Sequence, residues 1–530
     1  MNVTEFKRMD PLLLTDFYKT IHHLAYTPKL EYLVSYWTPR MSRYEYIDKV
    51  VVFGMQAFIK EYLCDLFNKN FFRRDKSEIL GEYRRIISNT MSVQAADTTE
   101  IEKLYDLGYL PVMIKAVPEG TRVNIKTPVY EISNTVKGFG WLVNYLETFI
   151  SVNVWYPMNS ASVAYAYRQI VNKYYEMTVS DKADKKVVFD ENGIEEQSSC
   201  DQLLTASRSA ACGDFSMRGM TSIEGAEKSS AAHLLSFTST ATIGSIAWLE
   251  AYYNCDCEKE VVGRGVPSTE HSVMSSYGRD GEYECYRHLI EDVFKTGLLS
   301  IVSDTYDYWN VVTNMIPSLK ESIMARDGKI IIRGDSGNPV DIICGTADGP
   351  LDPKKEYTPE ELGTTECLWR IFGGFINDKG YKVLDSHIGV IYGDAITYER
   401  ACEIYAKLVK RGFAASNVTL GIGSYTYQYV TRDSLGQALK ATNSIVDGQE
   451  RQIFKDPKTD KVKGANFKKS QKGMCCVYRD GEDILYKDEL TIEEAAKMEN
   501  NLLQPVFRDG MLLVDDSLSD IRRRLHGNAF

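Results

Sequence analysis

The chain has 530 residues, of which 44% are hydrophobic, and its formal net charge is -11. This length and apolar content predict more than one domain, each with a sizeable core. The negative charge argues against general nucleic-acid binding and against adhesion to anionic membranes, but a local basic pocket is compatible with it. The cysteines form no zinc-ligand set, and no apolar run approaches the roughly 18 residues of a membrane span. We therefore expect a cytoplasmic protein with reduced thiols that binds neither nucleic acid nor membrane.

The first part of the chain, residues 1–155, combines a predicted helix with β-rich segments. Asp10 is a suitable N-cap, Pro11 suits the first helical position, and apolar residues follow at helical spacing. Segments 33–36 and 123–129 have the composition of strands.

The most informative predicted strand is the run of three isoleucines at 330–332, which ends in Arg333-Gly334-Asp335. Because side chains alternate along an extended chain, Arg333 and Asp335 should point to the same side. A cation and a carboxylate placed in this way can bind phosphate, a metal or sugar hydroxyls. A salt-bridged turn is the alternative interpretation.

The same design recurs at other predicted strand ends. Polar residues follow apolar runs at 267–272, 303–307, 393–394 and 423–424, and amphipathic segments typical of helices occur at 284–294 and 398–411. Polar residues at the carboxyl ends of successive strands predict a parallel α/β barrel with its active site on that face. An open doubly wound sheet is the alternative.

The alternation stops near residue 425, and a lysine-rich run at 455–472 leads to short strands and a last helix. We therefore predict three regions: a mostly β domain built from both chain ends (1–155 with 425–530), an α/β barrel (156–424), and within the barrel an exposed, charged insertion (179–199).

Several common motifs are missing from the sequence, including the dinucleotide-binding glycine fingerprint, the phosphate-binding P-loop, HExxH and GxSxG. The acidic pair Asp515-Asp516 after an apolar run resembles the ribose-binding motif of one class of phosphoribosyltransferases. The glycine-rich turn that should follow is missing, and Ser517 to Asp520 has the pattern of a helix start.

Eight motifs occur in an order that resembles the nicotinamide phosphoribosyltransferase family over nearly the whole chain. They are Thr15–Lys19, Asp214–Gly219, Glu270–Ser272, Ser303–Asp307, Arg333–Pro339, Gly393-Asp394, Thr431–Asp433 and Phe454–Pro457. The resemblance implies a type II phosphoribosyltransferase fold, with an α/β barrel joined to a mostly β domain, and a head-to-tail homodimer with shared active sites. It also implies a reaction in which nicotinamide and phosphoribosyl pyrophosphate give nicotinamide mononucleotide and pyrophosphate with Mg²⁺.

The resemblance assigns roles to individual residues. Phe215 would stack on one face of the pyridine ring and Tyr18 of the other subunit on the second face, whereas ordinary core packing is the alternative for both. Arg218 would lie beside the ring. Asp335 would stabilise the cationic sugar, and Arg333 would position the ribose.

Further implied residues fall into three groups. Asp307 is implied as a further catalytic residue. The other residues implied to contact the substrates are Asp16, Ala241, Ser303, Gly393, Asp394, Gly423 and Ser424. The cations for pyrophosphate and its metal are Arg40, Arg432, Lys440, Lys455, Lys468 and Lys472, where a solvated loop is the alternative. His271 can receive a phosphate from ATP in this family, oriented by Glu270 or Asp304, whereas a structural histidine is the alternative. No residues are implied as a metal site formed by the protein alone.

Two departures from the family pattern bear on specificity. Ala241 stands where the family has an aspartate that accepts a hydrogen bond from the nicotinamide amide. Gly423-Ser424-Tyr425 replaces a run of three glycines at the 5′-phosphate site. The departures leave three alternatives open: a transferase that uses ADP-ribose pyrophosphate and forms NAD directly, a nicotinate phosphoribosyltransferase, and a non-catalytic binding protein.

Overall fold

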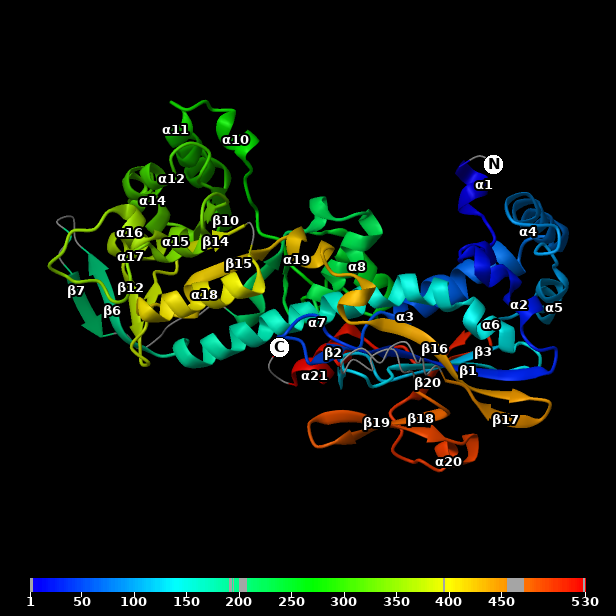
Figure 1. Cartoon of the computed structure of the whole chain (residues 1–530). Coiled ribbons are helices and arrows are strands. Elements are labelled where there is room, and N and C mark those ends of the chain that lie inside the picture. The colour runs from blue at the N-terminus through cyan, green and yellow to red at the C-terminus, as the bar shows by residue number, and fades with distance from the viewer. Residues whose placement is uncertain are drawn as a thin grey trace. The chain divides into compact units, whose positions relative to one another are not determined.

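The computed structural model describes residues 3–189, 193, 195–199, 207–393, 396–454, 471–527 and 530 (Figure 1). The chain divides into two compact units. The β unit consists of Met1–Val163, Trp248–Asp256 and Val430–Ala529, and the barrel unit of Ala164–Ala247, Cys257–Tyr429 and Phe530. Within the described ranges, none of the helices has the length and hydrophobicity that a membrane span requires.

The barrel unit is built on six parallel strands. They are β8 (Cys212–Asp214), β9 (Ser239–Thr240), β10 (Thr296–Val302), β11 (Asp327–Gly334), β14 (Ile388–Tyr392) and β15 (Val418–Ile422), in the order β10-β11-β14-β15-β8-β9. Parallel bridges from Ser239 to Arg264 and from Ser268 to Ser300 link both edge strands to segment 264–268. Segment 264–268 therefore joins β9 to β10, and β15, the last of the six strands, pairs with β8, the first. The sheet closes on itself, which confirms the predicted barrel.

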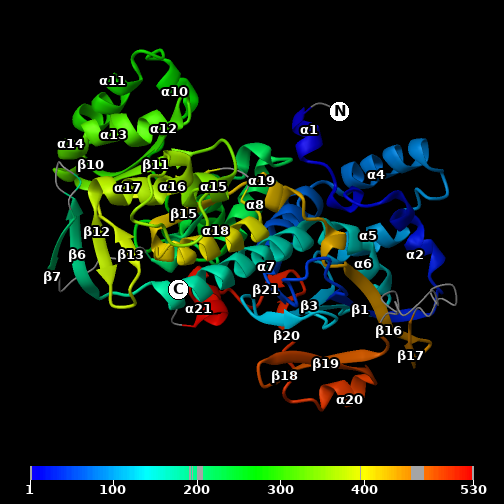
Figure 2. The same ribbon diagram turned by 60° about the vertical axis from the view of Figure 1, so that its left-hand side comes forward.

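Hydrophobic patterning explains these strands and the helices around them. In β11, Ile330 and Ile332 are fully buried, as expected for a strand inside a parallel sheet. Helix α18 (Tyr398–Lys410) starts where the Thr397 side chain accepts a hydrogen bond from the Arg400 N–H. Helices α15 (Pro339–Cys344) and α17 (Thr364–Phe372) pack beside β14. Figure 2 shows both of them next to α16 (Pro359–Leu362).

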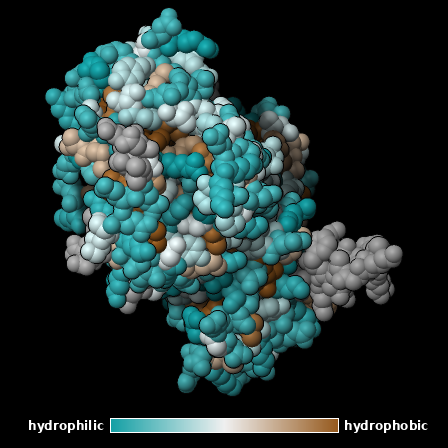
Figure 3. All heavy atoms as spheres, turned by 90° about the vertical axis from the view of Figure 1, so that its left-hand side faces the viewer, coloured by the Kyte–Doolittle hydropathy of each residue, from teal (hydrophilic) through white to brown (hydrophobic). Residues whose placement is uncertain are grey.

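The charged stretch at 179–199 contains an antiparallel hairpin of β6 (Ala183–Phe189) and β7 (Glu195–Ser199). Strand β6 also pairs with β12 (Gly374–Asn377), which pairs with β13 (Lys382–Leu384). Every residue of β7 is exposed, and the face of the molecule in Figure 3 is largely hydrophilic.

The β unit contains a seven-stranded sheet to which both ends of the chain contribute, as predicted. Its order is β17 (Gln449–Gln452), β16 (Gln437–Val446), β1 (Leu30–Pro39), β5 (Tyr130–Asn134), β3 (Val112–Ala116), β20 (Gln504–Arg508) and β21 (Met511–Leu512). Two further antiparallel pairs belong to this unit, β18 (Met474–Asp480) with β19 (Asp483–Leu490) and β2 (Lys49–Val51) with β4 (Arg122–Asn124). Helix α7 (Glu147–Thr178) begins in the β unit and ends in the barrel unit.

Two predictions for the N-terminal region were wrong. The expected helix after Asp10 is instead three short pieces, η1 (Pro11–Leu13), η2 (Phe17–Ile21) and α2 (His22–Ala25), although Asp10 does cap the first by accepting the Leu12 N–H at 2.9 Å. The chain leaves the helical conformation at Leu14, where ψ is 54°, and is extended at Asp16, where ψ is 144°. The strand expected at 123–129 ends at Asn124, because Lys126 has a φ of 79°.

Candidate active site

The predicted site residues of the barrel unit lie where strands end. Phe215 follows β8, Ala241 follows β9, Ser303 follows β10, Asp335 follows β11, Gly393 follows β14, Gly423 and Ser424 follow β15, and His271 opens α10 (His271–Ser275) soon after the bridging segment. Because the strands are parallel, their carboxyl ends lie on the same side of the barrel. This side, which we call the barrel mouth, therefore brings together the barrel residues that the sequence placed at strand ends.

Arg333 and Asp335 point to the same side, as the alternation predicted. The Arg333 guanidinium donates to Oδ2 of Asp335 at 3.0 Å. Oδ1 of Asp335 is buried and has no hydrogen-bond partner among the described residues. A Cβ at Gly393 would lie 2.4 Å from this oxygen, so only a glycine leaves the carboxylate in place.

Asp304 connects the ends of β10 and β11. Its Oδ2 accepts the backbone N–H of Asp335 at 3.2 Å and also the Ser336 hydroxyl. The Asp304 side chain is only 6% exposed, and its Oδ1 lies 3.8 Å from Nε2 of His271. Asp304, Asp335 and His271 each offer a possible metal ligand, with these atoms within 4.8 Å of one another. The sequence pattern suggested for Asp304 only a role in orienting His271, although the place of Asp304 directly after a predicted strand was a signal for a site residue.

His271 has a defined hydrogen-bond partner, since Nδ1 lies 3.0 Å from Oγ1 of Thr305. A tautomer with its hydrogen on Nδ1 would donate to Thr305 and leave the lone pair on Nε2. The side chain is 49% exposed, so this nitrogen is accessible to a phosphoryl donor.

Phe215 lies in a slot formed by two glycines. A Cβ at Gly421 would meet the ring at 2.6 Å, and one at Gly213 would meet it at 3.1 Å. The backbone N–H of Phe215 donates to the carbonyl of Ile422 at 2.8 Å, and this bond fixes the backbone of Phe215 beside β15. Neither glycine was predicted as a site residue, although an isolated glycine in a strand often marks such a close approach.

The side chains of Ser303 and Asp307 are engaged within the protein. Ser303 is fully buried, and its hydroxyl donates to the Ile301 carbonyl at 2.9 Å and accepts from the Tyr286 hydroxyl at 2.9 Å. Exposed Asp307 caps helix α12 (Tyr308–Asn310) by accepting the Asn310 N–H at 3.0 Å.

The two departures from the family pattern follow β9 and β15, which lie on either side of β8 in the sheet. Ala241 is exposed, and its N–H donates to the Asp214 carbonyl at 2.8 Å. Ser424 fills the space above Gly219, where a Cβ would lie 2.1 Å from its hydroxyl oxygen. Arg218 is exposed in η6 (Met217–Gly219) beside that contact.

The β unit holds a second group of predicted residues, the cations. Arg40 directly follows β1, and Lys440 lies on the neighbouring strand β16, opposite Tyr36. Burial and, secondarily, the nearby Arg432 lower the pKa of Arg40. A pocket of about 190 Å³ is lined by Arg40, Met41, Arg43, Asp433 and Gly436. An anion bound in this pocket would relieve the repulsion between Arg40 and Arg432.

Lys472 is the remaining described cation of this group. Its ammonium lies 4.0 Å from Glu489 and 5.2 Å from the centre of the Phe454 ring. Asp394, Lys455 and Lys468 lie outside the described residues.

Tyr18 and Asp16 are displayed on the surface of the β unit. Tyr18 is 54% exposed, which excludes ordinary core packing for its ring. Burial of part of the ring raises the pKa of Tyr18, as do Glu147 and Asp16, whereas Arg432 opposes the rise. Asp16 accepts the Thr148 hydroxyl at 2.5 Å.

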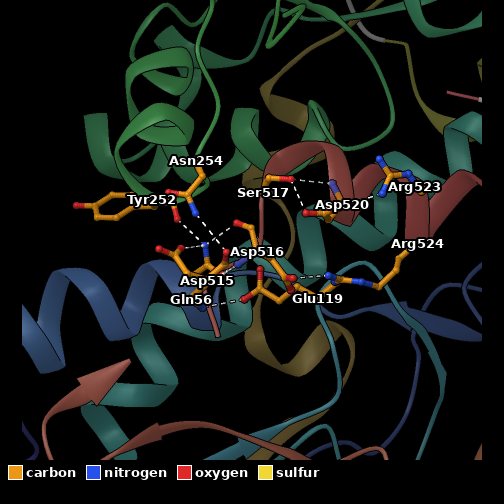
Figure 4. A network of polar contacts seen from close by, with 10 residues as sticks. All are labelled: Gln56, Glu119, Tyr252, Asn254, Asp515, Asp516, Ser517, Asp520, Arg523 and Arg524. Carbon is orange, nitrogen blue, oxygen red and sulfur yellow. Dashed lines mark hydrogen bonds and ion pairs between the residues drawn. The ribbon is translucent and has the colours of Figure 1, made fainter. Parts of the chain in front are cut away.

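The acidic pair Asp515-Asp516 is engaged inside the β unit (Figure 4). Asp515 accepts from the Gln56 amide at 3.0 Å, and Asp516 forms an ion pair with Arg524. Ser517 caps helix α21 (Leu518–His526), which confirms the expected helix start. The pair therefore has a structural role here.

Comparisons with known proteins agree with this geometry. Residues 210–510 match the nicotinate phosphoribosyltransferase (NAPRTase) family, and residues 10–93 match the nicotinamide phosphoribosyltransferase N-terminal domain. The chain is 38% identical to the nicotinamide phosphoribosyltransferase of Acinetobacter baylyi over 98% of this chain and 97% of that protein. It is 30% identical to that of Xanthomonas campestris pv. campestris over 97% of this chain and 98% of that protein.

A solved structure, the nicotinate-nucleotide pyrophosphorylase from Pyrococcus furiosus, covers 99% of this chain and 96% of its own, with a TM-score of 0.53 at 13% identity, and shows the fold alone. Fold and matches together define a phosphoribosyltransferase of the type II class. Within that class, the chain belongs to the nicotinamide phosphoribosyltransferase family.

Proposed function

We propose that this protein joins nicotinamide to phosphoribosyl pyrophosphate in the cytoplasm, giving nicotinamide mononucleotide and pyrophosphate for NAD salvage. The observation that carries the proposal is Asp335 at the barrel mouth, with one carboxylate oxygen held by Arg333 and the other buried without a protein partner. A carboxylate fixed in this way can stabilise a developing positive charge without reorganising.

In this reaction the pyridine nitrogen of nicotinamide bonds to C1 of the ribose, and the bond from C1 to the pyrophosphate oxygen breaks. The electron pair leaves with pyrophosphate, so the sugar is most positive in the transition state. Asp335 would stabilise that charge, and Phe215 would stack on the base from its glycine slot. Arg40, Arg432, Lys440 and Lys472 would bind the departing pyrophosphate.

Mg²⁺ would accompany the pyrophosphate. Asp304 and Asp335 fit this ion, because carboxylate oxygens are the ligands that Mg²⁺ prefers and each has one buried oxygen without a hydrogen-bond partner among the described residues. When bound, the ion would neutralise charge on the leaving group.

His271 would couple the reaction to ATP. Its Nε2 would attack the terminal phosphorus, forming an N–P bond while the P–O bond to ADP breaks and ADP leaves. Thr305 would hold Nδ1, so that Nε2 keeps its lone pair.

The active form would be a homodimer, with the barrel mouth from one subunit and Tyr18 and the cations from the β unit of the other. The exposed ring of Tyr18 supports this arrangement. Mixing inactive Tyr18→Ala with inactive Asp335→Ala should restore part of the activity, since some sites then contain both native residues. No recovery after demonstrated subunit exchange would contradict shared sites.

The function itself is tested by product mass. The protein is incubated with nicotinamide or nicotinate, each with phosphoribosyl pyrophosphate or ADP-ribose pyrophosphate, and with Mg²⁺. Nicotinamide mononucleotide as the main product supports the proposal. NAD, or nicotinate mononucleotide in preference, would overturn it.

A further inference from the structure

Glu147, the first residue of α7, lies between two ammonium groups within the β unit. Its Oε2 is 2.6 Å from Nζ of Lys19, and its Oε1 is 3.2 Å from Nζ of Lys440. The exposed fractions of the three side chains are 20% for Glu147, 2% for Lys19 and 44% for Lys440. Both carboxylate oxygens are therefore engaged, one by a buried and one by a half-exposed cation.

The contact to Lys19 fixes the segment that carries Tyr18. Lys19 is buried, so its ammonium needs a counter-charge, and Glu147 supplies it. Nζ of Lys19 lies 5.1 Å from the centre of the Tyr18 ring. The next residue of α7, Thr148, holds Asp16 through its hydroxyl. The start of α7 thus contacts the segment 16–19 at two points on either side of Tyr18.

The contact to Lys440 fixes a cation proposed to bind pyrophosphate. Lys440 lies on β16, opposite Tyr36 of β1. Strand β1 is the one that leads to Arg40. Its ammonium has three donors, of which Glu147 takes one. The remaining donors can bind an anion while Glu147 still orients the side chain.

We propose that Glu147 is a positioning residue for both substrates, holding Tyr18 for the base and Lys440 for the pyrophosphate in one fixed arrangement. The inference rests on the proposed function of Tyr18 and Lys440. A glutamine at this position has one acceptor oxygen, and its NH₂ group would face an ammonium. It can therefore satisfy one of the two lysines only.

The test is the KM for each substrate in Glu147→Gln. We expect both KM values to rise by roughly fivefold or more, with a smaller change in kcat, since loss of a charge-assisted hydrogen bond has about this size. Lys440→Met should raise the KM for the donor alone, since Lys440 is proposed to contact only the pyrophosphate. Glu31→Gln is the matched control, because Glu31 is 17% exposed and pairs with Lys137 in the same unit. It should leave both KM values unchanged.

A purely structural role for Glu147 predicts a different result. The thermal midpoint and kcat would then fall together through loss of active molecules, while both KM values stayed at the wild-type level, and this outcome would overturn the inference. If Glu147→Gln does not fold, Lys19→Met combined with Glu147→Gln removes the buried unpaired charge. The double variant should show the same rise in both KM values, and unchanged KM values would again overturn the inference.

Calorimetric titration with magnesium pyrophosphate separates this inference from the proposed function, because it requires no turnover. Weaker binding to Glu147→Gln than to Glu31→Gln would support the role of Glu147 at Lys440 even if the wild-type protein formed no nicotinamide mononucleotide. Equal binding to both variants would contradict that role.

Discussion

Asp304 accepts the backbone N–H of Asp335 at 3.2 Å, and this bond joins the ends of two neighbouring barrel strands. Asp335 is thereby fixed through its backbone by Asp304 and through its side chain by Arg333. The remaining carboxylate oxygen points past Gly393, which has no side chain to displace it. This degree of fixation is what electrostatic stabilisation of a transition state requires.

Replacing Asp335 by alanine should abolish turnover and leave the fold intact. The loss of a fixed carboxylate from the transition state typically costs several kcal/mol, so kcat should fall by about 100-fold or more. The measurement is kcat, with the thermal midpoint as a check on folding. Asp341→Asn is a suitable control, since Asp341 pairs with Lys407 on helices of the same unit. Near-normal turnover in folded Asp335→Ala would exclude this residue from the mechanism.

Replacing His271 by alanine should remove ATP hydrolysis and the stimulation by ATP while basal transfer continues. Thr305→Val removes the partner of Nδ1 and should weaken the ATP effect in part, because the imidazole then loses its fixed orientation. Both effects are read from product formation with and without ATP. An unchanged ATP response in His271→Ala would contradict phosphohistidine coupling.

The barrel could be predicted from the sequence because buried parallel strands are continuous apolar runs. The apolar runs expected before residues 303 and 423 are β10 and β15, which end at Val302 and Ile422. The alternation of side chains also predicted that Arg333 and Asp335 point to the same side. These features depend on local sequence alone.

Other features of the site depend on contacts between distant segments, which local patterns do not contain. The role of Asp304 requires β10 to lie beside β11, and the slot for Phe215 requires β15 to lie beside β8. The prediction of one helix after Asp10 was wrong for the same reason. Its apolar spacing was correct, but Asp16 is held by Thr148 of α7, and Tyr18 is left on the surface.

Glu119 should make stability depend on pH. Burial raises its pKa from 4.5 to about 7, opposed by the hydrogen bond from the Gln56 N–H. Because the folded-state pKa is the higher one, the contribution of Glu119 is fully present below about pH 4.5 and is lost as pH rises through 7.

Glu119→Gln stays neutral at every pH. Its unfolding free energy relative to wild type should therefore rise between pH 5 and pH 8, by at most about 3 kcal/mol. Urea unfolding at the two pH values measures the difference. Glu493→Gln, at an exposed ion pair with Lys497, should show no such rise. A difference that does not change with pH would mean that Glu119 is ionised in the folded protein.

Ala241→Asp should strengthen discrimination against nicotinate. Ala241 follows β9 at the barrel mouth, where its methyl group can neither accept a hydrogen bond from an amide nor repel a carboxylate. An aspartate there would accept from nicotinamide, a bond worth about 1 kcal/mol net, and would repel the negative charge of nicotinate. The ratio of kcat/KM for the two bases should then shift by roughly tenfold or more toward nicotinamide. If the ratio does not move while the variant remains folded, Ala241 does not face the base, and another group must recognise the amide.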